Sequence, residues 1–329
     1  MKFYLLSFLS GICEIGCICW GYNQGFSLLE TLILGCAYQF GNTFPRPHNM
    51  PKVQYIESGV IGLLACFGSF ALKDKISYLC MVIAIISCSI CMQTSRSVSK
   101  GKGVNTTIKR MIRIVGFGIS IWSVNYYKVI IMAILVISLG IIGKNEIPAV
   151  QREKISRHNL CIVMVLHQMH YFVYVYGVLF YVIKQKGIEL AVVYFLGTWM
   201  TYTLISPILE KTKVKNYLKW FFVGHSFLAV CLVLMSILIM DINKYILLWL
   251  LAGFGGGTVF CITKMWKKTS MGNSEDMVIA ENYGHWWGSF CAVIVAAISE
   301  NVKYFTLMSF VFVLGAMVAM LKGVKNNGY

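Results

Sequence analysis

The sequence predicts an all-α integral membrane protein of twelve transmembrane helices in two six-helix bundles, with the N- and C-termini in the cytoplasm. Three observations carry this prediction: an apolar composition, a series of separate apolar segments, and an uneven distribution of basic residues between them. Of the 329 residues, 58% are hydrophobic and 13% are charged, and the mean hydropathy is +0.70. Soluble domains carry about 25% charged residues. A soluble fold of this composition would therefore leave large apolar patches in water.

The apolar segments have the length that a bilayer requires. A spanning helix needs roughly 20 mainly apolar residues, and twelve such segments can be drawn, at 3–21, 26–44, 54–72, 76–96, 107–124, 126–143, 159–183, 188–208, 218–240, 244–263, 277–298 and 304–321. The first segment is predicted to be a retained helix, because Glu14 interrupts it and no cleavage site follows. Lys109, Arg110 and Arg113 fall inside the fifth segment. We expect them at its cytoplasmic end, reaching toward the headgroups.

The basic residues support this count and orientation. With the N-terminus inside, every internal inside loop carries at least two Lys or Arg residues and no outside loop carries more than two. A wrong number of helices would scramble this alternation, so the positive-inside rule favours twelve. The longest central polar stretch, 144–158, is then a cytoplasmic linker between an N-terminal bundle (1–143) and a C-terminal bundle (159–329). Duplicated halves of this kind are common in secondary transporters.

The net charge of +16 is explained by topology and by anionic lipid in the bilayer, so we expect no nucleic-acid partner. The twelve cysteines lie almost entirely in apolar segments, where a thiol behaves as a small hydrophobe. The spacing of Cys88 and Cys91 also fits a redox or zinc site, which we consider the weaker reading. No Walker loop is present, which argues against ATP hydrolysis. We expect no cofactor and no resident metal.

Polar side chains within the apolar segments are the candidate functional residues, because they are costly in a membrane. Glu14 lies midway along the first segment, where a carboxylate could exchange a proton. The seventh segment holds the densest set of polar residues: His167, Gln168, His170, Tyr171 and Tyr174. All of these except Gln168 are spaced so that they share one helical face. We predict that this face lines a substrate cavity. Packing or hydrogen bonding between helices is the alternative for both groups.

Three further residues are candidates for coupling or gating. Glu281 and His285 are four residues apart in the eleventh segment and can meet on one helical face. Glu30 lies in the second segment and could face the same cavity. Imidazole is also a common ligand of zinc, nickel and copper, so His167 and His170 leave metal binding open, although no fourth ligand is fixed by the sequence. His225 is predicted to lie at a membrane interface.

Local motifs add a resemblance to a known family. Residues 206–211 (SPILEK) resemble a degenerate copy of the cytoplasmic loop signature of the major facilitator superfamily. Residues 41–46 (GNTFPR) occupy the equivalent loop of the first half but lack its acidic residue and basic tail. The glycines of the tenth and eleventh segments resemble the family's glycine-rich second half. The resemblance implies a compact member of this family, in which helices 1, 4, 7 and 10 line a central cavity. Glu14 and the polar face of the seventh helix would then face each other.

These observations favour a secondary active transporter that works by alternating access and is coupled to protons. An aromatic, weakly charged cavity suits an amphiphilic small organic molecule or peptide, and we favour export, which makes the chain an efflux antiporter. No arginine or lysine is expected within the membrane, which argues against sugar phosphates and carboxylates as substrates. The expected partners are this substrate, protons and the lipid bilayer, in the plasma (cytoplasmic) membrane of a bacterium.

Three other readings stay open. One is a membrane-embedded transferase-type enzyme that uses His170 or Glu281 as a base. Another is a transporter of a metal or a metal chelate. The last is a receptor or assembly factor that binds a ligand without moving it.

Overall fold

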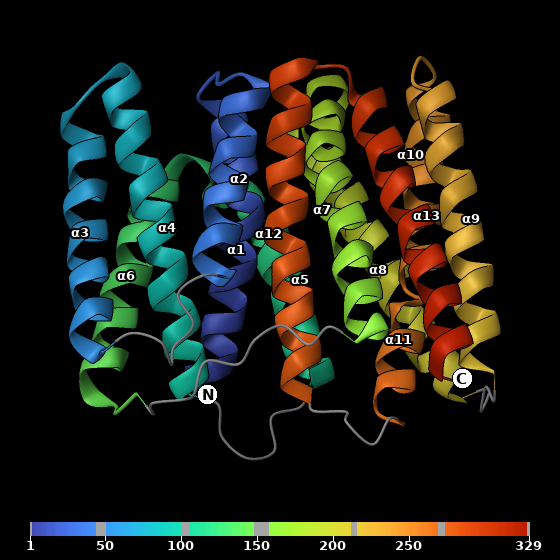
Figure 1. Ribbon diagram of the computed structural model, residues 1–329. Helices are drawn as coiled ribbons and strands as arrows, with labels where there is room; N and C mark the ends of the chain where they lie inside the picture. The colour runs from blue at the N-terminus through green and yellow to red at the C-terminus, as the bar shows by residue number, and fades with distance from the viewer. Residues whose placement is uncertain are drawn as a thin grey trace. The chain divides into compact units, whose positions relative to one another are not determined.

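The computed structural model describes residues 2–43, 51–99, 106–147, 158–211, 216–268 and 274–327, and every regular element in these ranges is a helix. The chain forms two compact units, Met1–Arg152 and Glu153–Tyr329 (Figure 1). Most of the predicted linker, residues 148–157, lies outside the described residues, as does the second half of the GNTFPR motif, residues 44–46. Some of the basic residues behind the positive-inside prediction also lie there: Arg46, Lys100, Lys102, Arg152, Lys154, Arg157, Lys213 and Lys215.

The N-terminal unit contains six α-helices and one short 3-10 helix. Their bounds are α1 Lys2–Asn23, α2 Leu28–Thr43, α3 Lys52–Ala71, α4 Asp74–Val98, α5 Thr106–Ser123, η1 Val124–Tyr126 and α6 Tyr127–Lys144. The C-terminal unit contains α7 Asn159–Lys186, α8 Ile188–Lys211, α9 Tyr217–Ile237, α10 Ile242–Gly256, α11 Val259–Trp266, α12 Ser274–Ile298 and α13 Val302–Asn327. Each of the twelve predicted segments overlaps a helix, and the tenth is divided between α10 and α11.

Contacts between helices give the relative directions of helices that pack together within each unit. In the N-terminal unit, the ammonium group of Lys52 at the start of α3 donates to the carbonyl of Gly143 at the end of α6, at 2.8 Å. The Cys66 thiol, near the end of α3, donates to the carbonyl of Lys128 at the start of α6. The two helices therefore run in opposite directions. Residues 108–144 form an apolar helical stretch of 37 residues. This stretch would be about 55 Å long if it were straight, and it is divided into α5, η1 and α6.

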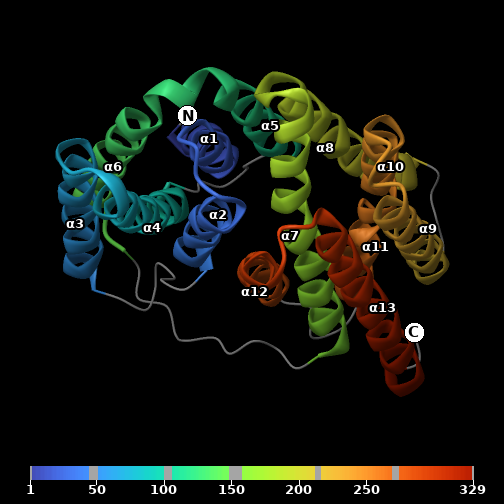
Figure 2. The ribbon, with the colours of Figure 1, turned by 90° about the horizontal axis from the view of Figure 1, so that it is seen from above.

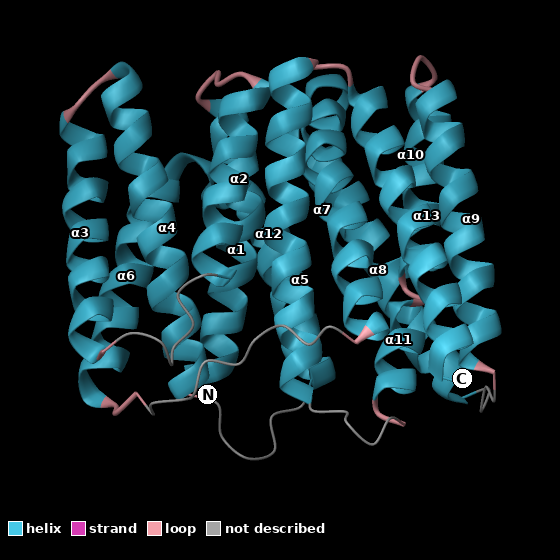
Figure 3. Cartoon of the chain, viewed as in Figure 1, coloured by secondary structure: helices cyan, strands magenta, loops and turns pink. Residues whose placement is uncertain are grey.

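Contacts with α7 give the directions of α12 and α13 in the C-terminal unit. The hydroxyl of Ser309 in α13 donates to the carbonyl of His170 in α7 at 2.8 Å, and Gly323 near the end of α13 packs against Asn159 at the start of α7. These helices are antiparallel. By contrast, α12 runs parallel to α7, because Gly284 meets Gln168 and Gly288 meets Phe172. Figure 2 shows α12 and α13 beside α7 from above, and Figure 3 shows that the described loops between helices are short.

Glycines allow the closest helix approaches in both units. A Cβ atom placed on Gly116 of α5 would lie 2.3 Å from the carbonyl oxygen of Phe8 in α1. A Cβ atom on Gly255 of α10 would lie 2.7 Å from the carbonyl oxygen of Gly224 in α9. Such backbone contact is typical of helices packed within membranes. Small residues there let two helices approach closely, and van der Waals packing stabilises their association in place of the hydrophobic effect. The glycine-rich run also explains why the tenth predicted segment breaks, since the chain leaves α10 at Gly257 and Thr258.

The exposed surface is that of a membrane protein. In α3, Ile61, Leu64 and Phe67 are 54, 66 and 58% exposed, a face that lipid would cover. Within the described residues, nine helical stretches are long and apolar enough to cross a bilayer. The predicted class, an all-α multi-pass membrane protein, is thus confirmed. Twelve crossings and cytoplasmic termini remain predictions.

Candidate functional site

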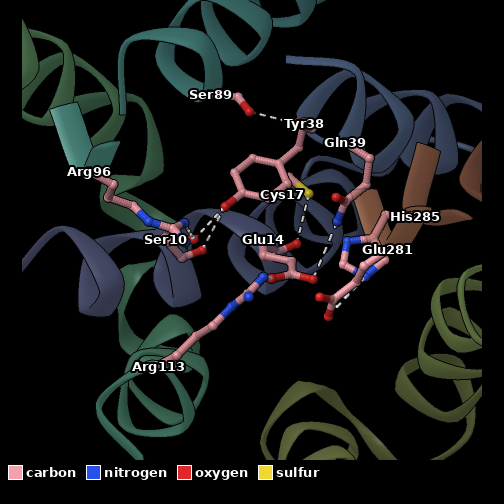
Figure 4. Close-up of polar contacts among 10 residues, drawn as sticks. All are labelled: Ser10, Glu14, Cys17, Tyr38, Gln39, Ser89, Arg96, Arg113, Glu281 and His285. Carbon is pink, nitrogen blue, oxygen red and sulfur yellow. Dashed lines mark hydrogen bonds and ion pairs between the residues drawn. The ribbon is translucent and has the colours of Figure 1, made fainter. Parts of the chain in front are cut away.

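The buried carboxylate of Glu14 is the centre of a polar network in the N-terminal unit (Figure 4). Glu14 lies near the middle of the 22-residue helix α1 and is 3% exposed. It forms an ion pair with the guanidinium group of Arg113 from α5. The Gln39 side chain of α2 donates a second hydrogen bond to the carboxylate at 3.3 Å. Three helices therefore contribute to this ion pair, in which the carboxylate is buried and the guanidinium group is 21% exposed. Removal of Arg113 would leave the buried carboxylate without its counter-charge.

A second part of the network lies next to Glu14 on α1. The hydroxyl groups of Ser10 and Tyr38 (α2) are 2.8 Å apart, and Nη1 of Arg96 donates to Ser10 Oγ at 3.2 Å. The Ser89 hydroxyl of α4 donates to the carbonyl of Tyr38 at 2.6 Å. Ser10 and Tyr38 are almost completely buried. Figure 4 shows Arg96 and Arg113 both directed toward this part of α1.

Two arginines correct the prediction from the sequence. Arg113 was expected to reach toward the headgroups, but its side chain turns into the bundle, where it meets Glu14. Arg96 lies in the last turn of α4, and the side chains of a helix tilt toward its N-terminus. Its guanidinium group therefore reaches back along α4 to Ser10. The argument against anionic substrates assumed that no arginine would lie within the membrane, and two guanidinium groups directed into the helical bundle remove its basis.

The C-terminal unit contains a different arrangement, a buried pair of histidines. His167 of α7 and His225 of α9 are at most 1% exposed, and Nδ1 of His167 lies 3.0 Å from Nε2 of His225. Nδ1 of His225 lies 3.0 Å from the carbonyl oxygen of Phe221 and 3.2 Å from the hydroxyl of Thr258. Thr258 sits at the break between α10 and α11. The prediction of an interfacial His225 was wrong, since it is fully buried against α7.

The hydrogen bonds define the tautomers of this pair. The Phe221 carbonyl can only accept, so Nδ1 of His225 carries the proton that it donates. In the neutral ring, Nε2 of His225 is then the acceptor for the Nδ1–H group of His167. This assignment leaves Nε2 of His167 with its lone pair. The pair is therefore a directed chain of hydrogen bonds from α7 to the backbone of α9.

The other predicted residues of α7 lie around this pair. The His170 ring is 4.6 Å from that of His167, and its Nδ1 atom is buried without a hydrogen-bond partner among the described residues. Tyr174 stacks on His170 with ring centroids 6.3 Å apart. Gln168 is 5% exposed and donates to the Met164 sulfur at 3.7 Å. Tyr171 is partly exposed and its ring contacts those of Trp199 and Tyr202 from α8.

The predicted coupling and gating residues occupy two separate places. Nε2 of His285 lies 3.9 Å from the carboxylate of Glu281, on one face of α12 (Figure 4). Glu30 is engaged at the start of α2, where its carboxylate accepts from the backbone N–H and the hydroxyl of Ser27 at 2.9 and 2.8 Å. The Ser27 hydroxyl also lies 3.3 Å from the backbone nitrogen of Glu30. This reciprocal pair is a capping box. It gives Glu30 a structural role, and its role in coupling stays a prediction.

The structure brings together residues that sequence reasoning did not. Glu14 meets Arg113 and Gln39, and His167 meets His225, whereas Glu14 and the α7 residues belong to different units and their meeting remains a prediction. The signal for Arg113 was present, because a basic residue inside an apolar segment normally pairs with an intramembrane acid. No group of three or more His, Cys, Asp or Glu residues that could hold a metal occurs within the described part of the chain.

Comparison with known proteins identifies the fold. No family model and no curated protein matches the chain. Among solved structures, a bacterial homologue of the lysosomal transporter Spinster matches with a TM-score of 0.61 and 12% identity, over 98% of this chain and 96% of that one. A D-xylose-proton symporter matches with a TM-score of 0.61 and 10% identity over the same shares. A bacterial homologue of the iron transporter ferroportin matches with a TM-score of 0.58 and 12% identity, over 99 and 100%. The chain therefore has the fold of the major facilitator superfamily.

Proposed function

We propose that this chain is a secondary active transporter that works by alternating access of two six-helix bundles and is coupled to protons. The observation that carries the proposal is the ion pair of Glu14 and Arg113, which holds a titratable carboxylate in the middle of a helix. Such a pair is costly in a membrane and is by default a functional hypothesis. The similar solved structures include transporters of several kinds, which supports transport as the general activity.

The proposed topology has twelve membrane crossings and both termini in the cytoplasm. The directions of packed helices support it, because α3 runs antiparallel to α6 and α7 runs antiparallel to α13, as an odd and an even crossing should. The break between α10 and α11 lies inside one crossing, since residues 242–266 form one apolar stretch of 25 residues. The distribution of lysine and arginine in the sequence supports the orientation.

Protonation of Glu14 would change the charge of the N-terminal bundle. With Glu14 ionised, the carboxylate and the Arg113 guanidinium neutralise each other. When a proton binds the carboxylate, the ion pair is lost and Glu14 no longer balances the positive charge of Arg113. A conformation that offers this charge water or a substrate anion is then favoured over one that does not. Proton binding and the conformational equilibrium are therefore linked.

The histidine pair of the C-terminal bundle offers a second place for a proton. A proton that binds Nε2 of His167 makes an imidazolium ion, whose Nδ1–H group already points at Nε2 of His225. Transfer of this Nδ1 proton to His225 moves the positive charge from α7 to α9. The His167 ring is then neutral, with its proton on Nε2 and its lone pair on Nδ1. His225 stays hydrogen-bonded to Phe221. The pair is connected to the α10–α11 break through Thr258, which supports a role in conformational change.

The proposed substrate is an amphiphilic small organic molecule or a small peptide, with export as the preferred direction. The partly exposed aromatic group of Tyr171, Trp199 and Tyr202 supports it, because aromatic rings offer stacking faces and polar edges to such molecules.

The test is transport by the purified protein in proteoliposomes with an imposed pH gradient. The panel contains fluorescent cationic dyes, dipeptides, a nucleoside, D-xylose and Fe²⁺. We expect gradient-driven flux of at least one compound, and for Glu14→Gln we expect loss of the gradient's effect while exchange of the same compound at equal pH continues. Glu57→Gln is the matched control, because Glu57 is exposed on α3 of the same bundle. Flux that responds equally to the gradient in Glu14→Gln would overturn the coupling, and turnover of lipid without flux would favour an enzyme.

A further inference from the structure

The charges of the N-terminal network do not balance. Glu14 carries one negative charge, which the guanidinium group of Arg113 compensates. Arg96 adds a second guanidinium group, and no described carboxylate lies within ion-pair distance of it. Its one hydrogen bond within the described part of the chain goes to the neutral hydroxyl of Ser10. The network therefore retains one uncompensated positive charge.

The position of Arg96 makes this charge unusual. Ser10, which holds the guanidinium group, lies about 12 Å along the helix axis from Lys2 at 1.5 Å per residue. A surface arginine would extend toward water and keep its donors hydrated. Arg96 instead is partly buried, and its Nε atom is buried without a hydrogen-bond partner among the described residues. An unpartnered donor on a charged group is costly.

We infer that Arg96 is the recognition group for an anionic ligand, a carboxylate or phosphate carried by a small molecule. A guanidinium group presents five N–H donors in a planar fork, which matches the oxygens of either group. Ser10 uses one donor of Nη1 and holds the fork in place, while Tyr38 holds Ser10. The ligand would supply the missing negative charge and satisfy Nε.

The neighbouring ion pair would tune this site. Glu14 attracts Arg113 and repels an incoming anion, so the carboxylate competes with the ligand for positive charge. Loss of the Glu14 charge would remove this competition and strengthen anion binding. This inference rests on the proposed function only for the route that brings a solute to Arg96, because binding itself needs no gradient.

The test is ligand binding to the full chain in phosphatidylcholine nanodiscs, measured by isothermal titration calorimetry. The probes are phenyl phosphate and benzoate, with benzyl alcohol as the neutral analogue. We expect the two anions to bind more tightly than benzyl alcohol. Arg96→Gln should weaken anion binding about tenfold or more, the value of one charged hydrogen bond, and leave benzyl alcohol unchanged. Glu14→Gln should tighten anion binding.

Arg110→Gln is the matched control, because Arg110 is exposed on α5 of the same bundle, and it should bind the anions as the wild type does. Arg96→Lys keeps the charge but loses the fork, and should give an intermediate affinity if Arg96→Gln does not fold. Equal affinity of the wild type for the anions and benzyl alcohol would overturn the inference, as would equal anion affinity in the wild type and either folded Arg96 variant.

A further arm distinguishes the two sources of a phosphate. A lipid headgroup at Arg96 would weaken phenyl phosphate binding in discs that contain phosphatidylglycerol, in the wild type and not in Arg96→Gln. Unchanged binding assigns the site to a free solute. Failure of the proposed function is separable, because anions that bind but are not moved across a vesicle membrane contradict transport and leave the site intact.

Discussion

The two bundles solve the problem of buried polar groups in opposite ways. The N-terminal bundle holds formal charges, Glu14 with Arg113 and the additional Arg96. The C-terminal bundle holds a neutral chain of hydrogen bonds, from His167 through His225 to the carbonyl of Phe221. Removing one partner of a buried charge pair destabilises a protein strongly, whereas removing one partner of a neutral hydrogen bond destabilises it less. The comparison suggests that the N-terminal bundle is the part of the molecule that senses charge.

The largest predicted effect tests the charged side of this comparison. Arg113→Gln should destabilise the protein by about 3–5 kcal/mol, because it leaves the buried Glu14 carboxylate unpaired. The double variant Glu14→Gln/Arg113→Gln should recover much of that loss. Melting temperatures in detergent measure both, with Arg110→Gln as the control. Equal melting temperatures for Arg113→Gln and Arg110→Gln would show that the ion pair contributes nothing to stability.

The next effect should be alike in both bundles, because it depends on backbone contact and not on charge. Gly116→Ala and Gly255→Ala should each cost about 1–3 kcal/mol through overpacking, since each new Cβ atom would meet a backbone oxygen of the neighbouring helix. Gly140→Ala is the control, because no atom lies within 4 Å of its Cβ position. That control should stabilise α6 slightly, as alanine favours a helix. A harmless Gly116→Ala would contradict the close packing of α1 on α5.

The neutral side is tested by the histidine pair. His225→Leu should cost about 1–3 kcal/mol, because the Nδ1–H group of His167 is left buried without an acceptor. His167→Leu/His225→Leu should be less destabilised than the sum of the single variants, since both partners are then apolar. A cycle of four melting measurements gives this coupling. Strict additivity would mean that the two rings do not interact.

The smallest effect concerns Glu30, which separates a structural role from a coupling role. Glu30→Ala removes the Glu30 half of the capping box of α2, the bonds to the backbone N–H and hydroxyl of Ser27, and should cost about 0.5–1.5 kcal/mol. Glu57→Ala is the control for loss of an acidic side chain elsewhere in the bundle. If the cap is the whole role of Glu30, gradient-driven flux per folded molecule should be unchanged. A loss of coupling in Glu30→Ala would restore the sequence-based prediction of a gating residue.

The fold was largely predictable, because helices in a membrane are specified by local properties. The length and apolarity of a segment determine whether it can span, so the twelve predicted segments match the helices to within a few residues. The tenth segment shows the limit, since hydropathy does not reveal that α10 ends at Gly256. That break depends on the packing of glycines against α8 and α9.

The site was predictable only in part. Glu14 and the α7 residues stood out because a polar group inside an apolar segment is rare, whatever its partners. The partners of these residues did not stand out, because hydropathy and spacing give the position of a residue along one helix and not the direction of its side chain. Arg113 was assigned to the headgroups and His225 to an interface for this reason, and Arg96 was not singled out.

The sequence by itself determined that this protein is a multi-pass helical membrane protein with a few costly polar groups at known positions along the chain. Only the tertiary structure decided which of these groups share a site. Arg113 reaches Glu14 because Gly11 and Gly116 bring α1 and α5 into backbone contact. His225 reaches His167 because α11 and α13 each pack against both α7 and α9, so that the two rings extend toward each other. The physical reason is that the cost of burying a polar group is local, whereas its compensation depends on the neighbouring helix.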